Sequence, residues 1–186
     1  CNAEGYCSIG KVNVTITDDG CGANLYKQLA ANTTTATFRT TNVTDATLDA
    51  ANKTTVDNGT QIRIKKKDKS NSATRNGVIR FDVSTIPTTA GNISANLLLY
   101  NETASKDGNF LFKPLTQTFV EAQTTWNNRI TGTAWTTAGG TVSANTNVAL
   151  KLTKAVGTKT INISGMTAVW VDNSANNYGV WVQCTD

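Results

Sequence analysis

Hydrophobic and polar residues alternate with a two-residue period over several short stretches of the chain, as they do in β-strands that bury one face. Near the beginning, Val12, Val14 and Ile16 alternate with polar residues, which predicts an amphipathic strand over 12–17. The residues DDG that follow favour a turn. The same pattern predicts further strands over 33–41, 61–64, 77–83, 96–100, 109–115, 148–152, 159–163 and 178–183.

Two of these stretches predict how their side chains are buried. In 77–83, the side chains of Ile79, Phe81 and Val83 share one face of the strand. The run NLLLY over 96–100 is apolar without alternation, which is typical of a strand that is buried on both faces.

A helix is predicted only over 165–171, where Met166, Val169 and Trp170 recur at helical spacing. The chain is also rich in Thr and Asn, which favours strands and turns over helices. Many short strands with turns between them, and almost no helix, predict an all-β fold. The expected architecture is an antiparallel β-sandwich of the jelly-roll type.

Composition and charge exclude several classes of function. The formal net charge is only +4, charged residues make up 16% of the chain, and there is no histidine. Without histidine the chain lacks the commonest general base and the commonest metal ligand. The small positive charge also lacks the broad, aromatic-rich basic surface of nucleic-acid-binding proteins, and no apolar run is long enough to span a bilayer. We therefore expect no metal, no cofactor and no nucleic-acid partner.

The cysteines Cys1, Cys7, Cys21 and Cys184 lack the paired spacing of a zinc site, so two disulfides in an oxidising compartment are the better interpretation. Four cysteines allow three pairings. We favour Cys21 with Cys184, which leaves Cys1 with Cys7. Lipidation of Cys1 is an alternative. No leader precedes Cys1 in this numbering, so we expect that any signal peptide has been removed.

Candidate N-glycosylation sites are also frequent. The triplet Asn-x-Ser/Thr, without proline at the middle position, marks an acceptor asparagine in a secreted protein. The candidates are Asn13, Asn32, Asn42, Asn52, Asn58, Asn92, Asn101 and Asn162. Together with the cysteines, they predict a secreted, glycosylated protein located outside the cell, at the cell surface.

A series of motifs follows from about residue 36. They are DATLD (45–49), VDNGTQIRI (56–64), GVIRFDVSTIP (77–87), ISANLLLY (93–100), FVEAQTTWNNR (119–129) and ISGMTAVWVDNSANNYGVWVQ (163–183). In order and spacing this series resembles the DNRLRE-domain family, which consists of secreted prokaryotic jelly-roll modules, some of them classed as carbohydrate-binding modules. The resemblance covers about residues 36–183.

The resemblance implies a β-sandwich domain over 36–186, an extracellular location and no catalytic centre. It also implies that four large side chains pack in the core and do not stack on sugars: Phe81, Leu98, Trp126 and Trp170. Residues 1–35 have no counterpart in the family. We assign them to an N-terminal cysteine-bearing extension that carries the candidate strand over 12–17.

The carboxylates that a two-carboxylate glycosidase would need form no recognisable motif. The candidates are Asp18, Asp19, Asp82, Glu102, Glu121 and Asp172. Calcium is conceivable near Asp45 and Asp49 or in the turn 57–59, but no spacing of an EF-hand is present. We therefore expect no catalytic residue and no enzyme activity.

A basic ridge is the main candidate for ligand contact. If Ile62 and Ile64 point inward, the basic residues between and after them alternate outward, where they can contact an acidic polysaccharide. These residues are Arg63, Lys65, Lys67 and Lys69. The alternative is a solvated hairpin tip whose like charges prevent pairing between sheet edges. Trp135, expected to be exposed in the loop GTAWTTAGG, either stacks on a sugar ring or anchors its loop.

The strand over 12–17 has two interpretations. It is either the first strand of its own sandwich, held by a disulfide to Cys184, or a strand that adds to the next molecule through Val12, Val14 and Ile16. Such a head-to-tail contact does not close and builds a filament. We favour the second, because a Gly-rich joint, DDGCGAN, separates the strand from the domain. The predicted function is the structural subunit of a pilus-like or adhesive surface fibre that polymerises with itself by strand addition. The alternative is a monomeric carbohydrate-binding module for an acidic polysaccharide.

Overall fold

The computed structural model describes residues 36, 38, 42–66, 73–90, 92–102, 104, 106–144 and 148–185. Several predicted features lie outside these residues and stay predictions. They are the strand over 12–17, the cysteines Cys1, Cys7 and Cys21, the sequons at Asn13 and Asn32, the acids Asp18 and Asp19, and the ridge residues Lys67 and Lys69.

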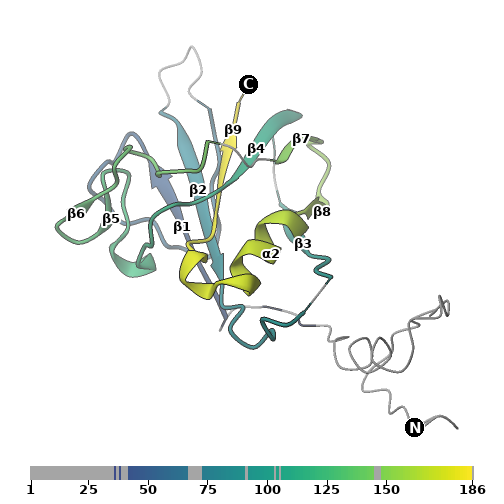
Figure 1. Cartoon of the computed structure of the whole chain (residues 1–186). Coiled ribbons are helices and arrows are strands. Elements are labelled where there is room, and N and C mark those ends of the chain that lie inside the picture. Colours follow the sequence, from purple (N-terminus) through teal and green to yellow (C-terminus); the bar gives the residue numbers. More distant parts are fainter. Residues whose placement is uncertain are drawn as a thin grey trace, which may run out of the picture.

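A five-stranded antiparallel sheet forms the centre of the fold (Figure 1), with the strand order β1-β2-β9-β4-β7. Each strand pairs with its neighbours in antiparallel register. The strands are β1 (Val43–Asp49), β2 (Arg75–Phe81), β9 (Val180–Cys184), β4 (Gly108–Pro114) and β7 (Val148–Leu152).

The strand pairs are nested like the two arms of one long hairpin. β3 (Asn96–Asn101) pairs with β8 (Gly157–Asn162), and β5 (Asn128–Ile130) pairs with β6 (Thr133–Ala134). From the outside inward, β2 pairs with β9, β3 with β8, β4 with β7 and β5 with β6. A rolled hairpin of this kind is a jelly roll. The predicted all-β antiparallel sandwich is therefore confirmed.

One face of the central sheet packs against the β3–β8 pair and the helix α2 (Ser164–Asp172), as Figure 1 shows. Phe112 of β4 and Val180 of β9 are fully buried there, together with Ile161 of β8 and Trp170 of α2. Burying large apolar side chains contributes roughly 1.5–3 kcal/mol each, so this face supplies much of the stability of the fold.

The helix predicted over 165–171 is confirmed as α2. Met166 and Trp170 lie on its buried side, and each is 2% exposed. Val169, the third residue of the predicted spacing, faces solvent instead. None of the helices in the described part of the chain is long and apolar enough to cross a membrane.

The opposite face of the central sheet packs against the connection between β4 and β7, which contains β5, β6 and the short helix η2 (Glu121–Gln123). Leu48, Val78 and Trp181 point from the sheet into this second core. The expected apolar face of 77–83 is present, but Val78 shows that the other face of β2 is buried as well. A second short helix, η3 (Ser174–Asn176), precedes β9.

The prediction that 96–100 is buried on both faces is wrong. Leu97 is 4% exposed, whereas Leu98 and Tyr100 are 62% and 65% exposed. The side chains alternate because β3 belongs to a two-stranded sheet that covers the central sheet on one side only. The other side of β3 faces solvent. Leu98 is therefore not the core residue that the family resemblance implied.

The stretch 61–64 is extended but outside the named strands, and an isolated antiparallel bridge joins Lys65 to Arg75. Ile62 and Ile64 pack against the first core, as the alternation predicts. Of the predicted strand over 33–41, most residues lie outside the described part. Phe38 does act as an anchor, since its ring lies 6.4 Å from that of Phe81.

Candidate functional site

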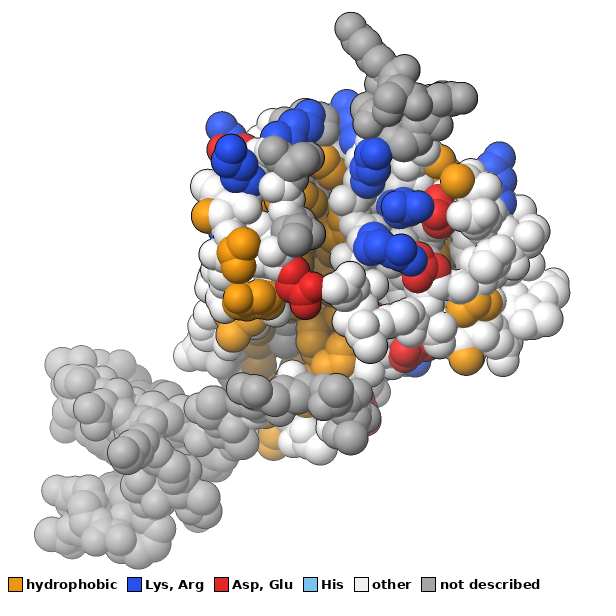
Figure 2. Space-filling model, turned by 180° about the vertical axis from the view of Figure 1, so that it is seen from behind, with side chains coloured by type: hydrophobic (Ala, Val, Ile, Leu, Met, Phe, Trp, Pro, Cys, Tyr) orange, Lys and Arg blue, Asp and Glu red, His pale blue; other side chains and the backbone are white. Residues whose placement is uncertain are grey.

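A groove of about 1090 Å³ opens between the central sheet and the β3–β8 pair. One wall is the extended segment 60–66, and the other is β3 with the adjacent part of β8. Figure 2 shows this face as a hollow with hydrophobic side chains at its floor and Lys and Arg side chains along its sides.

Segment 60–66 is held as a wall because Gly77 leaves room beneath it. A Cβ at Gly77 would lie 2.7 Å from Cγ2 of Ile62. The missing side chain at Gly77 therefore leaves the space in which this isoleucine packs against β2. The backbone N–H of Arg63 donates to Oγ1 of Thr47 at 3.0 Å, and the bridge between Lys65 and Arg75 fixes the end of the segment. The isoleucines therefore point inward, and the basic side chains between them point outward.

The groove has an excess of positive charge. Six basic residues line it, namely Arg63, Lys65, Lys66, Arg75, Lys106 and Lys159. Three acidic residues line it, namely Asp45, Glu102 and Asp107. Two of the six, Arg63 and Arg75, pair with carboxylates outside the lining, so the lining and these two partners together carry one more positive than negative group; in a hollow with low-dielectric walls this excess attracts anions.

Two carboxylates outside the lining hold the arginines of the first wall. Nη2 of Arg63 lies 2.8 Å from Oδ2 of Asp57, and Nε of Arg75 lies 2.9 Å from Oδ2 of Asp49. Burial opposes ionisation of Asp49, but hydrogen bonds from the Ala51 N–H and from Arg75 prevail and lower the pKa of this carboxyl. Both arginines are thus positioned by an acidic partner.

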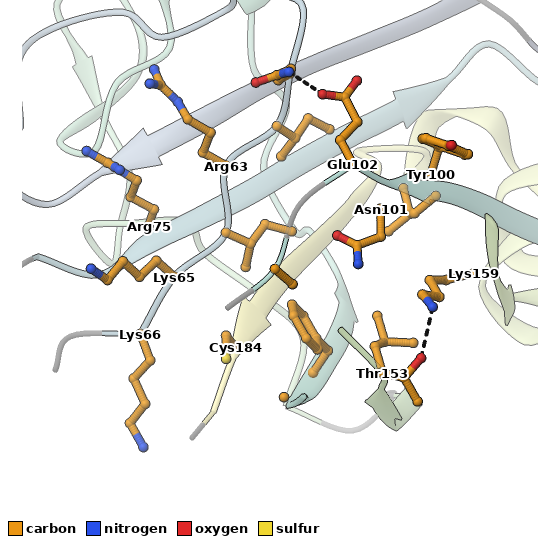
Figure 3. A pocket seen from close by; sticks show the side chains of 18 of the residues that line it. Arg63, Lys65, Lys66, Arg75, Tyr100, Asn101, Glu102, Thr153, Lys159 and Cys184 are labelled. Atoms are coloured by element: carbon orange, nitrogen blue, oxygen red, sulfur yellow. Dashed lines mark hydrogen bonds between the residues drawn. The ribbon is translucent and has the colours of Figure 1, made fainter. Parts of the chain in front are cut away.

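The opposite wall presents the sole aromatic ring that is largely exposed among the described residues, that of Tyr100. Figure 3 shows Tyr100, Asn101 and Glu102 of this wall across the groove from the basic wall. The amide of Asn101 donates to the carbonyl oxygens of Lys154 and Ala155, each at 3.0 Å. Tyr100 therefore stands on a strand whose end is fixed by side-chain hydrogen bonds.

Two polar contacts lie at different places along the groove (Figure 3). Nε2 of Gln61 donates to Oε2 of Glu102, which connects the two walls. Nζ of Lys159 donates to Oγ1 of Thr153 at 2.9 Å (Figure 3). These contacts leave the groove open along most of its length.

Asp45 lies on the floor side of the groove, in β1. Burial, and secondly the negative charge of Glu121, raise the pKa of Asp45. No group of three or more potential metal ligands occurs among the described residues. The proposed calcium ligands Asp49 and Asp57 are instead bound to Arg75 and Arg63.

The remaining candidate carboxylates lie on different elements. Asp82 follows β2, Glu121 lies in η2, and Asp172 ends α2. The side chain and the backbone N–H of Ser84 lower the pKa of Asp82 by hydrogen bonding.

The structure corrects the expectation for Trp135. This residue is 4% exposed, and its indole Nε1 donates to the carbonyl oxygen of Thr125 at 3.0 Å. A buried ring cannot stack on a sugar, so Trp135 anchors its loop against the second core. Of the other predicted contact residues, Arg63 and Lys65 line the groove.

The predicted sequons within the described part lie on the surface or at its margin. Asn52, Asn58, Asn92 and Asn162 are exposed, while Asn42 and Asn101 are half-buried. Glycosylation at these positions stays a prediction. Cys184, the described cysteine of the predicted disulfides, is buried at the end of β9 and lines the groove.

Sequence reasoning missed Tyr100, Lys66, Lys106 and Lys159 as groove residues. Tyr100 was hidden because the run NLLLY predicts complete burial. The lysines come from segments that are far apart in the sequence and meet only when β3 and β8 pair. The charge of the basic ridge was the signal that pointed to this region.

Similarity to known proteins bears on the function of this groove. No curated protein matches the chain. A family model described as carbohydrate-binding module family 96 matches residues 35–184, which is most of the chain. The sequence was expected to resemble jelly-roll modules that include carbohydrate-binding members, and this match supports that expectation. The narrower assignment to DNRLRE domains stays a prediction. It also supports the carbohydrate-binding alternative and lends nothing to the filament. The chain belongs to carbohydrate-binding module family 96.

Proposed function

We propose that this module binds an acidic polysaccharide across the rim of the groove. The observation that carries the proposal is the set of six basic side chains that line the groove, together with the exposed ring of Tyr100 at its rim, on the solvent side of β3. Aromatic rings offer an apolar face for a pyranose ring, and Lys and Arg side chains pair with carboxylate or sulfate groups.

The two walls have separate roles in this proposal. Arg63, Lys65 and Lys66 extend outward from the first wall (Figure 3), where they meet the acidic groups of a chain that crosses the groove. Lys159 of the second wall contacts a further acidic group of the same chain, and the ring of Tyr100, on the outer face of β3, packs against a sugar beyond the rim. Because these side chains are solvated, each contact is weak, and affinity depends on several contacts along one chain.

Titration calorimetry with an oligouronate and with a neutral oligosaccharide of equal length tests the proposal. We expect binding of the acidic ligand that weakens as salt is added, because exposed charges are screened. Lys66→Glu and Lys159→Glu should each weaken binding by roughly twofold to fivefold, which corresponds to contacts worth up to about 1 kcal/mol.

Lys53→Glu is the matched control, because it makes the same charge change on an exposed residue outside the groove lining. Equal binding of the neutral sugar, or equal losses in all three variants, would contradict an acidic ligand. The family consists of binding modules, which agrees with the expectation that the chain is not an enzyme. We also propose an extracellular location, where such polysaccharides and disulfides are found.

A further inference from the structure

Within the described part of the chain, β3 is paired along one edge only. It pairs with β8, and no backbone hydrogen bond to its other edge is present among the described residues. The N–H of Ile163 donates to the carbonyl oxygen of Ala95 at 2.9 Å, which extends the same register by one pair. Since hydrogen-bonded and non-hydrogen-bonded pairs alternate, the backbone groups of Asn96, Leu98 and Tyr100 point away from β8.

This open edge lacks the protection that exposed edges usually have. Proteins blunt such edges with lysine, proline, a bulge or a covering segment. The sequence of β3, NLLLYN, contains no charge and no proline, and its register with β8 is uninterrupted. The edge is therefore competent to pair with another strand.

The groove beside this edge has an apolar interior. Six residues with large Ile, Leu or Phe side chains line it: Ile62, Ile64, Ile79, Leu99, Phe110 and Leu152. Five of the six are only half-buried, because a two-stranded sheet cannot cover a five-stranded one. Figure 2 shows hydrophobic side chains at the floor of the hollow. A strand added to β3 would turn every second side chain toward this floor.

We infer that the occupant of the groove is the segment Val12–Thr17 of the same chain. The segment has six residues, as β3 has, so the two match in length at about 20 Å. It carries no charge, and Val12, Val14 and Ile16 form one apolar face that suits the floor.

Insertion of residues 12–17 into the groove of their own chain is favoured over insertion into a second copy, because the linker keeps the segment at a high local concentration. Residues 18–35 connect the segment to the domain, and their extended length reaches roughly 60 Å, about three times the length of β3. A linker that spans the distance gives an effective concentration in the millimolar range. Insertion into the same domain therefore outcompetes insertion into a neighbour in dilute solution. A filament would use the same contacts between molecules.

Hydrogen exchange measured on the full chain tests the inference. We expect slow exchange of the amides in 12–17, to an extent that does not change with protein concentration, in a monomer. Val14→Asp places a charge on the apolar face and should abolish this protection. Thr15→Asp places the same charge on the opposite face and should preserve it.

A second pair of variants tests β3, the strand to which residues 12–17 are inferred to add. Leu98→Pro removes an N–H that points from the open edge, and edge strands tolerate proline at such positions. It should abolish protection of 12–17 while the amides between β3 and β8 stay protected. Leu98→Ala loses the same side chain but keeps the N–H, so protection should remain.

Two results would overturn the inference. Fast exchange of 12–17 in the unmodified chain would show that the groove does not hold this segment. Protection that appears only together with oligomers would show that the occupant belongs to a second copy. Because the inference involves the floor of the groove and the β3 backbone, neither result depends on whether the rim binds a polysaccharide.

Discussion

Arg75 and Asp49 face each other directly across β2 and β1, and Nε of the arginine lies 2.9 Å from Oδ2 of the aspartate. The carboxylate is 4% exposed and also accepts a hydrogen bond from the N–H of Ala51 at 2.8 Å. The pair joins the end of the edge strand to the wall of the groove, because Arg75 also bridges to Lys65.

Asp49→Asn should destabilise the fold by about 1–3 kcal/mol at neutral pH, since it weakens several hydrogen bonds to a buried charged group. The pKa of Asp49 lies below its usual value of 3.8. The stabilisation is therefore complete above pH 3.8 and is lost as the pH falls through the lowered pKa of the folded state. Denaturant unfolding measured across this acid range should show a shallower pH dependence for the variant. Asp172→Asn, on the exposed end of α2, should leave both quantities nearly unchanged.

Gly179→Ala should be strongly destabilising. Gly179 has a φ of +94°, and a Cβ there would collide with the carbonyl oxygen of Ile79 and lie 2.9 Å from Cβ of Arg80. Strain of this kind costs on the order of 1–3 kcal/mol before the collision is counted. Gly165→Ala in α2 is the matched control, because no atom lies within 4 Å of its Cβ position. Thermal unfolding should show a loss for the first variant and a small gain for the second, and similar changes would contradict the prediction.

Tyr100 and Trp135 should separate binding from stability. Tyr100→Ala removes an exposed ring from the groove wall, so it should weaken glycan binding while the melting temperature changes little. Trp135→Phe removes the indole hydrogen bond to the buried Thr125 carbonyl, which should cost about 1–3 kcal/mol of stability. Calorimetric titration of the folded Trp135 variant should give an unchanged affinity. A loss of affinity there would place the ligand on the opposite face of the sheet.

The predicted disulfide between Cys21 and Cys184 can be tested by mass spectrometry of unreduced peptides. We expect a crosslinked peptide that contains both cysteines and a second that joins Cys1 to Cys7. A native disulfide typically contributes about 2–4 kcal/mol, so reduction should lower the melting temperature clearly. Cys184→Ala should remove the first crosslink and leave the second. Exchange among all four cysteines would show that the pairing is different.

Periodicity predicted the strands well because each buried strand leaves its own local pattern. The fold contains β7 and β9 where the sequence alternates over 148–152 and 178–183. It contains α2 where Met166 and Trp170 recur at helical spacing. The exposed faces were harder to predict. Leu98 and Tyr100 are apolar like their buried neighbours, and only the narrow two-stranded sheet leaves them uncovered.

The groove could be predicted only in part, because strand pairing, which has no local signal in the sequence, brings some of its residues together. The outward alternation of Arg63 and Lys65 follows from the local sequence and is confirmed by the inward packing of Ile62 and Ile64. Lys159 reaches the same groove through the pairing of β8 with β3, which has no local signal. The burial of Trp135 depends on a long connection that folds over the second core, and its Thr- and Gly-rich surroundings predict only a loop.

The position of β9 has a consequence for biosynthesis. This strand, the last to leave the ribosome among the described elements, lies between β2 and β4 in the middle of the sheet. Until residues 180–184 have emerged, the nascent chain holds two separate halves, β1–β2 and β4–β7, whose inner edges lack their common neighbour. Such unpaired strand edges can pair with other chains and so cause aggregation. Residues 180–184 must therefore emerge from the ribosome before the domain can close, and any chaperone that protects it acts on these two halves.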